Sequence, residues 1–77
     1  MSVTAVDIVG YMIELGIHID KFHVDYHKDF SDIGLDSLDR ANLFLGVEEK
    51  YAIAIAEDDI DKLNTIIAVV DYINERC

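Results

Sequence analysis

The chain has 77 residues, of which 52% are apolar, and its 16 acidic and 6 basic side chains give a net charge of −10. A chain this short forms one domain, over residues 1–77, and buries only roughly 60% of the surface that its unfolded form exposes. Its acidic surface repels the phosphates of nucleic acids and anionic lipids, which excludes nucleic acid as a partner, and attracts basic patches on proteins. With no proline and four glycines, the composition favours helices joined by a few loops.

The single cysteine, Cys77, allows no internal disulfide, which indicates a reducing compartment. No apolar run approaches the ~18 residues that a membrane-spanning helix needs. The N-terminus also lacks the basic and apolar stretches of a secretory signal. We therefore expect a cytoplasmic protein without a membrane span.

Residues 3–16 are predicted to form the first helix, which Thr4 or Ser2 would cap and Gly16 would end. Its apolar side chains recur at helical spacing in two neighbouring lines, which together form a broad apolar face. One line holds Val6, Val9 and Ile13, and the other holds Ile8, Met12 and Leu15.

Residues 17–35 are predicted to form a long connection. Apolar and polar residues alternate in parts of it, but one pair of short strands is not stable alone. We expect an ordered loop that packs Phe30 and Ile33 against the helices. A loop of this length in a compact domain is usually functional.

Residues 37–51 are predicted to form the second helix, with Asp36 as its N-cap and Asp39 in an imperfect capping box. Two apolar lines run along it. One holds Leu43, Val47 and Tyr51, and the other holds Leu38, Ala41 and Leu45. A small core needs only one line, so the second is either an exposed docking face or part of a wide core face.

The remaining third of the chain is predicted to be an extended connector followed by two helices. Residues 52–56 would place Ile53 and Ile55 in the core. A short helical piece follows at 57–63, with acids in its first turn, and a last helix at 65–75, with Thr65 as its N-cap. The buried face of this last helix is predicted to hold Ile66, Val69, Val70 and Ile73. The predicted fold is therefore all-α, with three main helices and one short helix around a small core.

Ser37 stands between a glycine turn and the start of the second helix. As a nucleophile it would need a base and oxyanion donors. The sequence around it is not the G-x-S-x-G elbow, and 77 residues leave little room for a substrate pocket. A serine esterase that uses one of the histidines is therefore disfavoured.

A metal site is also weakly supported. His23 and His27 have the i, i+4 spacing that zinc-binding histidines use on helices, but the segment is not predicted to be helical. His18 and Asp20 are nearby in the sequence. The acids in 57–61 could hold a divalent cation loosely, which leaves an acidic cation-binding or interaction module as an alternative.

An attachment point fits Ser37 better. A phosphodiester there would face the free N–H groups and the positive dipole end of a helix. Such a site needs no internal base, because another enzyme performs the transfer. The other interpretation is that Ser37 only helps to cap the helix.

The stretch around Ser37, residues 30–39 (FSDIGLDSLD), resembles the prosthetic-group site of acyl carrier proteins. Three later stretches are similar to the family's second and last helices: 47–51 (VEEKY), 63–66 (LNTI) and 70–73 (VDYI). The resemblance implies a small four-helix bundle with a long loop between helices one and two. It implies that Ser37 carries 4'-phosphopantetheine, whose thiol holds acyl groups as thioesters, and that the protein is a non-catalytic carrier.

The same resemblance implies a set of partners: a phosphopantetheinyl transferase, and acyl-loading, synthase and acyl-transfer enzymes with basic docking patches. Family recognition positions correspond to Asp36, Leu38, Asp39, Glu48 and Glu49. With Arg40 and the apolar residues Ala41 and Leu45, they form the predicted partner-recognition set. We expect a monomer that serves fatty-acid, polyketide or another specialised acyl biosynthesis.

The chain departs from the family pattern at a few positions. Arg40 stands where the family usually has a neutral residue, Asn42 where an acid is common, and Ala56 where a proline often stands. Gly46 is expected to weaken its helix by ~1 kcal/mol relative to alanine. These departures indicate a specialised carrier. The aspartate before Ser37 favours an acyl carrier, with a peptidyl carrier as the alternative.

Overall fold

The computed structural model describes residues 2–76, so Met1 and Cys77 lie outside the described residues. The described chain holds four helices: α1 (Ala5–Glu14), α2 (Ser37–Tyr51), α3 (Glu57–Ile60) and α4 (Ile66–Arg76). They confirm the predicted all-α fold of three main helices and one short one, with a long loop between the first two. Over the described range, none of the helices has the length and apolar character needed to cross a membrane.

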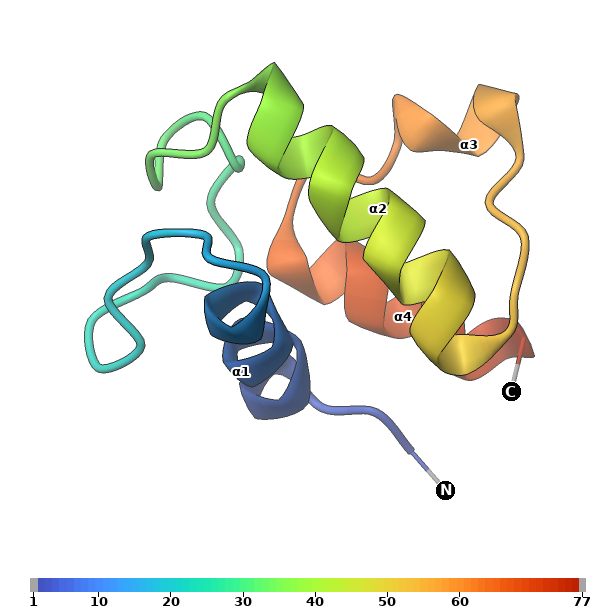
Figure 1. Cartoon of the computed structure of the whole chain (residues 1–77), viewed down its shortest axis with the longest axis horizontal. Helices are drawn as coiled ribbons and strands as arrows, with labels where there is room; N and C mark the ends of the chain where they lie inside the picture. Colours follow the sequence, from blue (N-terminus) through green and yellow to red (C-terminus); the bar gives the residue numbers. More distant parts are fainter. Residues whose placement is uncertain (1, 77) are drawn as a thin grey trace.

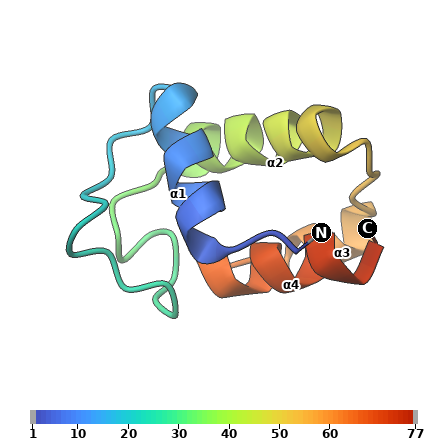
Figure 2. The same ribbon diagram turned by 90° about the horizontal axis from the view of Figure 1, so that it is seen from below.

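The two long helices α2 and α4 run in the same general direction, and the long loop covers the end of the molecule where both begin (Figure 1). In the view turned by 90°, α2 and α4 form two layers, and α1 runs steeply from the level of α4 to that of α2 (Figure 2). This arrangement places the apolar sides of three helices around one shared core.

The first helix is shorter than predicted, because its capping residue is Thr4. The Thr4 hydroxyl accepts from the Asp7 N–H at 3.2 Å, and the Asp7 carboxylate accepts from the Thr4 N–H at 3.0 Å. This reciprocal pair satisfies two N–H groups that the helix leaves open. The helix ends at Glu14, and Gly16 takes a φ of 85° that suits glycine.

The predicted apolar face of α1 is too wide. Ile8, Val9 and Met12 are buried, whereas Val6, Ile13 and Leu15 are exposed. A helix at the side of a small core buries only the stripe that faces its neighbours. One of the two predicted lines therefore lies largely in solvent.

The long loop is ordered by contacts with α4 and the turn before it, as predicted. The Phe30 N–H donates to the Asn64 carbonyl at 2.8 Å, and the Ile67 N–H donates to the Tyr26 carbonyl at 3.2 Å. Phe30 is buried and Ile33 is half-buried. Both packing predictions for this loop are confirmed, and the loop is fixed to the body of the domain just before α2.

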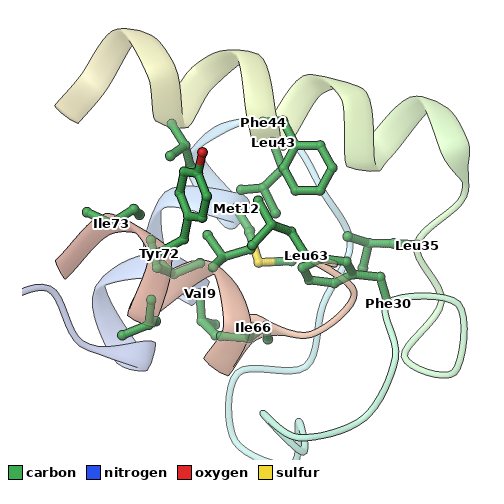
Figure 3. Packing of buried hydrophobic residues seen from close by; sticks show 14 of the residues in the cluster. Val9, Met12, Phe30, Leu35, Leu43, Phe44, Leu63, Ile66, Tyr72 and Ile73 are labelled. Carbon is green, nitrogen blue, oxygen red and sulfur yellow. The ribbon is translucent and has the colours of Figure 1, made fainter. Parts of the chain in front are cut away.

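The core is built from α1, the loop, α2 and α4 (Figure 3). Leu43 and Val47 of α2 are fully buried, and Tyr51 is half-buried. All four residues predicted to form the inner face of α4 are buried: Ile66, Val69, Val70 and Ile73. Helical spacing therefore identified the inner face of α4 and one buried line of α2.

The segment after α2 follows the prediction in outline. Ile53 and Ile55 are half-buried and pack against the core, as expected of the connector. The predicted helix at 57–63 ends earlier, at Ile60, because the N–H groups of Lys62 and Leu63 donate to carbonyls three residues back, at 2.9 and 3.1 Å, and form turns. The Asn64 amide then donates to the Asp61 carbonyl at 2.7 Å. Thr65 caps α4, since its hydroxyl accepts from the Ala68 N–H at 3.0 Å.

Gly46 has a packing role that the sequence did not show. It is buried in α2, and a Cβ there would lie 2.6 Å from the Tyr11 hydroxyl oxygen and 3.2 Å from Leu15 Cδ1. A glycine at this position lowers helix propensity but leaves room for the Tyr11 and Leu15 side chains to pack against α2.

We predict that Gly10→Ala and Gly46→Ala affect stability differently. A Cβ at Gly10, in the middle of α1, meets nothing within 4 Å, so the alanine should raise the free energy of unfolding by ~1 kcal/mol. At Gly46 the same gain is offset, because the Tyr11 ring must move. Urea unfolding of both variants measures the difference, and equal gains would contradict the packing role of Gly46.

Candidate functional site

The second helix begins at Ser37 because Asp36 and Asp39 cap it. Asp36 has an extended backbone, and its carboxylate accepts from the Asp39 N–H at 2.8 Å. The Asp39 carboxylate accepts from the Asp36 N–H at 3.4 Å. The predicted capping box is confirmed, with aspartate in the place of the usual glutamate or glutamine. Asp36 therefore provides the cap, and the interpretation of Ser37 as the capping residue is wrong.

The Ser37 side chain is exposed, and within the described part of the chain its hydroxyl makes no hydrogen bond. The loop before it turns at Gly34, which has a φ of 95°, and the Leu35 N–H donates back to the Phe30 carbonyl at 2.9 Å. Leu35 is buried, so it anchors the chain two residues before the serine. Ser37 is thus held at the start of α2 with its side chain exposed to solvent.

None of the three histidines hydrogen-bonds to Ser37 in the described structure. His23 instead pairs through Nδ1 with the Asp20 carboxylate at 2.8 Å. The pKa of the Asp20 carboxyl is lowered, mainly by this hydrogen bond with His23 and to a smaller extent by one from the Phe22 N–H. A nucleophilic serine needs its base within hydrogen-bond reach, so the structure gives no support to the esterase hypothesis.

The residues proposed for a metal site do not come together. Among the described residues, no cluster of three or more histidine, cysteine, aspartate or glutamate side chains is arranged to hold a metal ion. Asp59, one of the acids in α3, is committed to other contacts. Its carboxylate accepts from the Tyr72 hydroxyl at 2.9 Å and lies 3.6 Å from the Arg76 guanidinium.

An open groove of about 470 Å³ starts at Ser37 and runs between α2 and the segment at the end of α3. One wall comes from α2 and the other from Ile60 and Asp61. The α2 wall consists of Ser37, Arg40, Ala41, Phe44, Leu45 and Glu48. A flexible group attached to Ser37 would therefore have a partly apolar surface beside it.

Phe44 belongs to this wall, and the sequence analysis missed it. It lies in neither predicted apolar line of α2, yet it is buried, and its ring meets that of Phe30 edge-on with centroids 6.3 Å apart. Phe44 precedes Val47 by three residues, and this i, i+3 spacing is the signal that could have placed it on the inner face. The Phe30–Phe44 contact joins the loop to the helix that starts at Ser37 (Figure 3).

The second apolar line of α2 is exposed. Leu38 is 68% exposed and Leu45 is 59% exposed, and Ala41 is also exposed. Of the two interpretations left open by the sequence, the wide core face is therefore wrong. Unpaired apolar side chains beside acids are typical of a docking surface.

The acids of the predicted recognition set differ in their surroundings. Asp36 and Asp39 are bound to the helix cap. The Glu48 carboxylate accepts from the Ile55 N–H at 3.1 Å and helps to hold the connector. Glu49 is exposed. Together they keep the rim of the Ser37 site acidic.

Arg40, the remaining member of the set, is partly buried. Its Nη2 donates to the Asn64 side-chain oxygen at 3.3 Å, and its guanidinium carbon lies 5.9 Å from the centre of the Phe44 ring. Its Nε is buried and has no hydrogen-bond partner. The side chain therefore lies along the domain and does not extend from it.

The residues at the start of α2 suit a serine-linked phosphodiester. The serine oxygen is exposed, the helix presents its N-terminal end there, and a groove begins at the same point. The positive end of the helix dipole and its first N–H groups favour an anion. This is the arrangement expected of a domain that carries a tethered group.

A family model described as a phosphopantetheine attachment site matches residues 14–73. An acyl carrier protein of Chlamydia trachomatis serovar D is 40% identical over 63 residues, which cover 82% of this chain and 80% of the relative. An acyl carrier protein of Zymomonas mobilis is 37% identical over 77 residues, 99% of this chain and 97% of the relative. One from Buchnera aphidicola is 42% identical over 62 residues, 80% of this chain and 77% of the relative.

The fold and the family match define the class: the chain is a phosphopantetheine-binding carrier domain. Within this class, it belongs to the acyl carrier protein family. Its cofactor is 4'-phosphopantetheine, and it is a non-catalytic carrier, not an enzyme. The resemblance stated from the sequence is therefore confirmed.

Proposed function

We propose that Ser37 carries the 4'-phosphopantetheine arm and that the chain acts as one carrier domain over residues 1–77. The observation that carries the proposal is the exposed serine at the start of α2. Ser37 is not needed as the helix cap, because Asp36 is the N-cap. In the attachment, the serine oxygen would form a bond to the phosphorus of coenzyme A that carries the pantetheine. The pyrophosphate bond would break, 3',5'-ADP would leave, and the hydroxyl proton would pass to a base of the transferase.

The arm, when attached, supplies a terminal thiol that holds acyl groups as thioesters. The residues of this chain position the arm and present it. The acidic rim and the exposed residues Leu38, Ala41 and Leu45 would meet the basic, partly apolar patches of partner enzymes. These partners are a phosphopantetheinyl transferase and acyl-loading, synthase and acyl-transfer enzymes.

We further propose that the chain acts as a cytoplasmic monomer in acyl biosynthesis, of fatty acids, polyketides or another specialised product. The curated relatives, named acyl carrier proteins, support an acyl over a peptidyl carrier. The departures at Arg40, Asn42 and Ala56 favour a specialised pathway.

A loading experiment tests the acyl assignment. The chain with its arm attached is offered to an acyltransferase with malonyl-coenzyme A, and separately to amino-acid-activating enzymes. We expect the mass of the chain to rise by the malonyl group and not by an amino acid. Loading by amino acids alone would show a peptidyl carrier instead.

A further inference from the structure

Arg40 has charge and hydrogen-bonding capacity that the described residues do not use. A guanidinium has five N–H donors in a fixed fork. One contact goes to the Asn64 side chain, and Nε is buried without a partner. Leaving a buried donor unpaired is unfavourable, so such a group calls for an acceptor.

Arg40 also takes no part in the ion pairs of the described residues. Lys62 and Arg76 lie within 4.0 Å of the Asp59 carboxylate, whereas Arg40 makes no ion pair with any carboxylate in residues 2–76. Arg40 lacks such a pair although acidic side chains outnumber basic ones in this chain, which has a net charge of −10. The two acids closest to Arg40 in the sequence, Asp36 and Asp39, form the cap of α2.

The position of Arg40 relative to Ser37 indicates which hydrogen-bond acceptor could pair with its guanidinium. The two residues are three apart in α2, so their side chains are neighbours on the helix surface. The Arg40 guanidinium contacts Asn64 and the Phe44 ring, so its flexible side chain would turn to reach a group on the serine. Ser37 and Arg40 both border the same groove. Any group joined to the Ser37 oxygen therefore begins within one helical turn of Arg40.

We propose that Arg40 binds the phosphodiester of the arm on Ser37; this inference rests on the proposed function. The phosphate is the part of the arm nearest the serine, and a guanidinium matches phosphate oxygens in shape and charge. Binding gives the Arg40 charge the anionic partner that the described residues lack. It also offsets the repulsion of the new anion by the acidic rim, and it holds the base of the arm beside the groove.

The experiment compares each protein with and without the arm, for the wild type and three variants. Arg40→Gln removes the charge, Arg40→Lys keeps it without the fork, and Lys50→Gln removes a charge from the far end of the same helix. The first readout is the Arg40 Nε–H signal of the wild type in NMR. The second readout is the change in melting temperature on arm attachment. For each protein it is the melting temperature with the arm minus that without it.

We expect arm attachment to move the Arg40 Nε–H signal and to raise the melting temperature of the wild type by roughly 4 °C, the response of a small domain to one added interaction. Arg40→Gln should lose this increment, Lys50→Gln should keep it, and Arg40→Lys should keep part of it. High salt should reduce it, because it screens an exposed ion pair.

An unmoved Nε–H signal, or an equal increment in the wild type and Arg40→Gln, would overturn the inference while leaving Ser37 as the attachment site. An effect that appears only after malonyl loading would also overturn it, because Arg40 would then bind a carboxylate of the cargo. A chain whose mass does not rise with transferase and coenzyme A would overturn both the inference and the proposed function.

Discussion

Ser37→Ala is expected to abolish attachment of the phosphopantetheine arm. The wild-type chain, incubated with a broad-specificity phosphopantetheinyl transferase and coenzyme A, should gain the mass of one arm, and the variant should gain none. The reason is chemical: alanine has no oxygen to form the bond to phosphorus. Intact-protein mass spectrometry measures the result directly.

The variant should otherwise fold normally. The Ser37 hydroxyl is exposed and makes no hydrogen bond within the described residues, and the cap of α2 depends on Asp36 and Asp39. Surface substitutions of this kind change the free energy of unfolding by only about 0.5 kcal/mol or less. A normal helical circular dichroism spectrum would therefore separate loss of the attachment site from loss of the fold.

Ser31→Ala is the matched control, because Ser31 is an exposed serine of the loop six residues earlier. It should gain one arm like the wild type. If the wild type gains no mass with several transferases, or if Ser37→Ala still gains an arm, Ser37 is not the attachment site.

Phe30→Ala is expected to lower the free energy of unfolding by about 3–5 kcal/mol, the usual loss when a buried phenylalanine is truncated. Phe30 is 1% exposed and contacts the Phe44 ring edge-on. Small domains have only about 5–15 kcal/mol of net stability, so the variant should be marginally folded. Urea unfolding followed by circular dichroism measures the loss.

Phe22→Ala provides the control for this second prediction. Phe22 belongs to the same loop but is 81% exposed, so its truncation should change the free energy of unfolding by about 0.5 kcal/mol or less. Similar losses in the two variants would show that the loop is not anchored through Phe30. The contrast matters for function, because Phe30 lies seven residues before Ser37 and fixes the loop that leads to it.

Much of the local structure could be predicted from the sequence. The capping boxes of α1 and α2 depend on residues three apart in the chain, and helix propensity and periodicity act over the same short range. The predicted inner-face residues of α4, and those of α2 apart from the missed Phe44, were therefore identified correctly. The motif around Ser37 is local as well, and with the similar stretches in 47–73 it indicated the family.

Other features depend on contacts between distant parts of the chain, which periodicity does not contain. Val6 and Ile13 are exposed because only a narrow face of α1 packs against the core. The burial of Phe44 depends on Phe30, which the loop brings to it. From the sequence, Gly46 is only a residue of low helix propensity. The structure shows that the nearby Tyr11 side chain leaves little room for a larger residue there.

Ser37 and Arg40 illustrate the same division. Local signals in the chain were enough to place a serine at the start of a helix and an unusual arginine one turn later. The packing of the domain adds that Arg40 lies against Phe44 and Asn64, and that Ser37 and Arg40 border one groove. The physical reason is that hydrogen-bond partners and solvent exposure are set by the elements packed around a residue, whereas its chemistry and helical position are set by the chain.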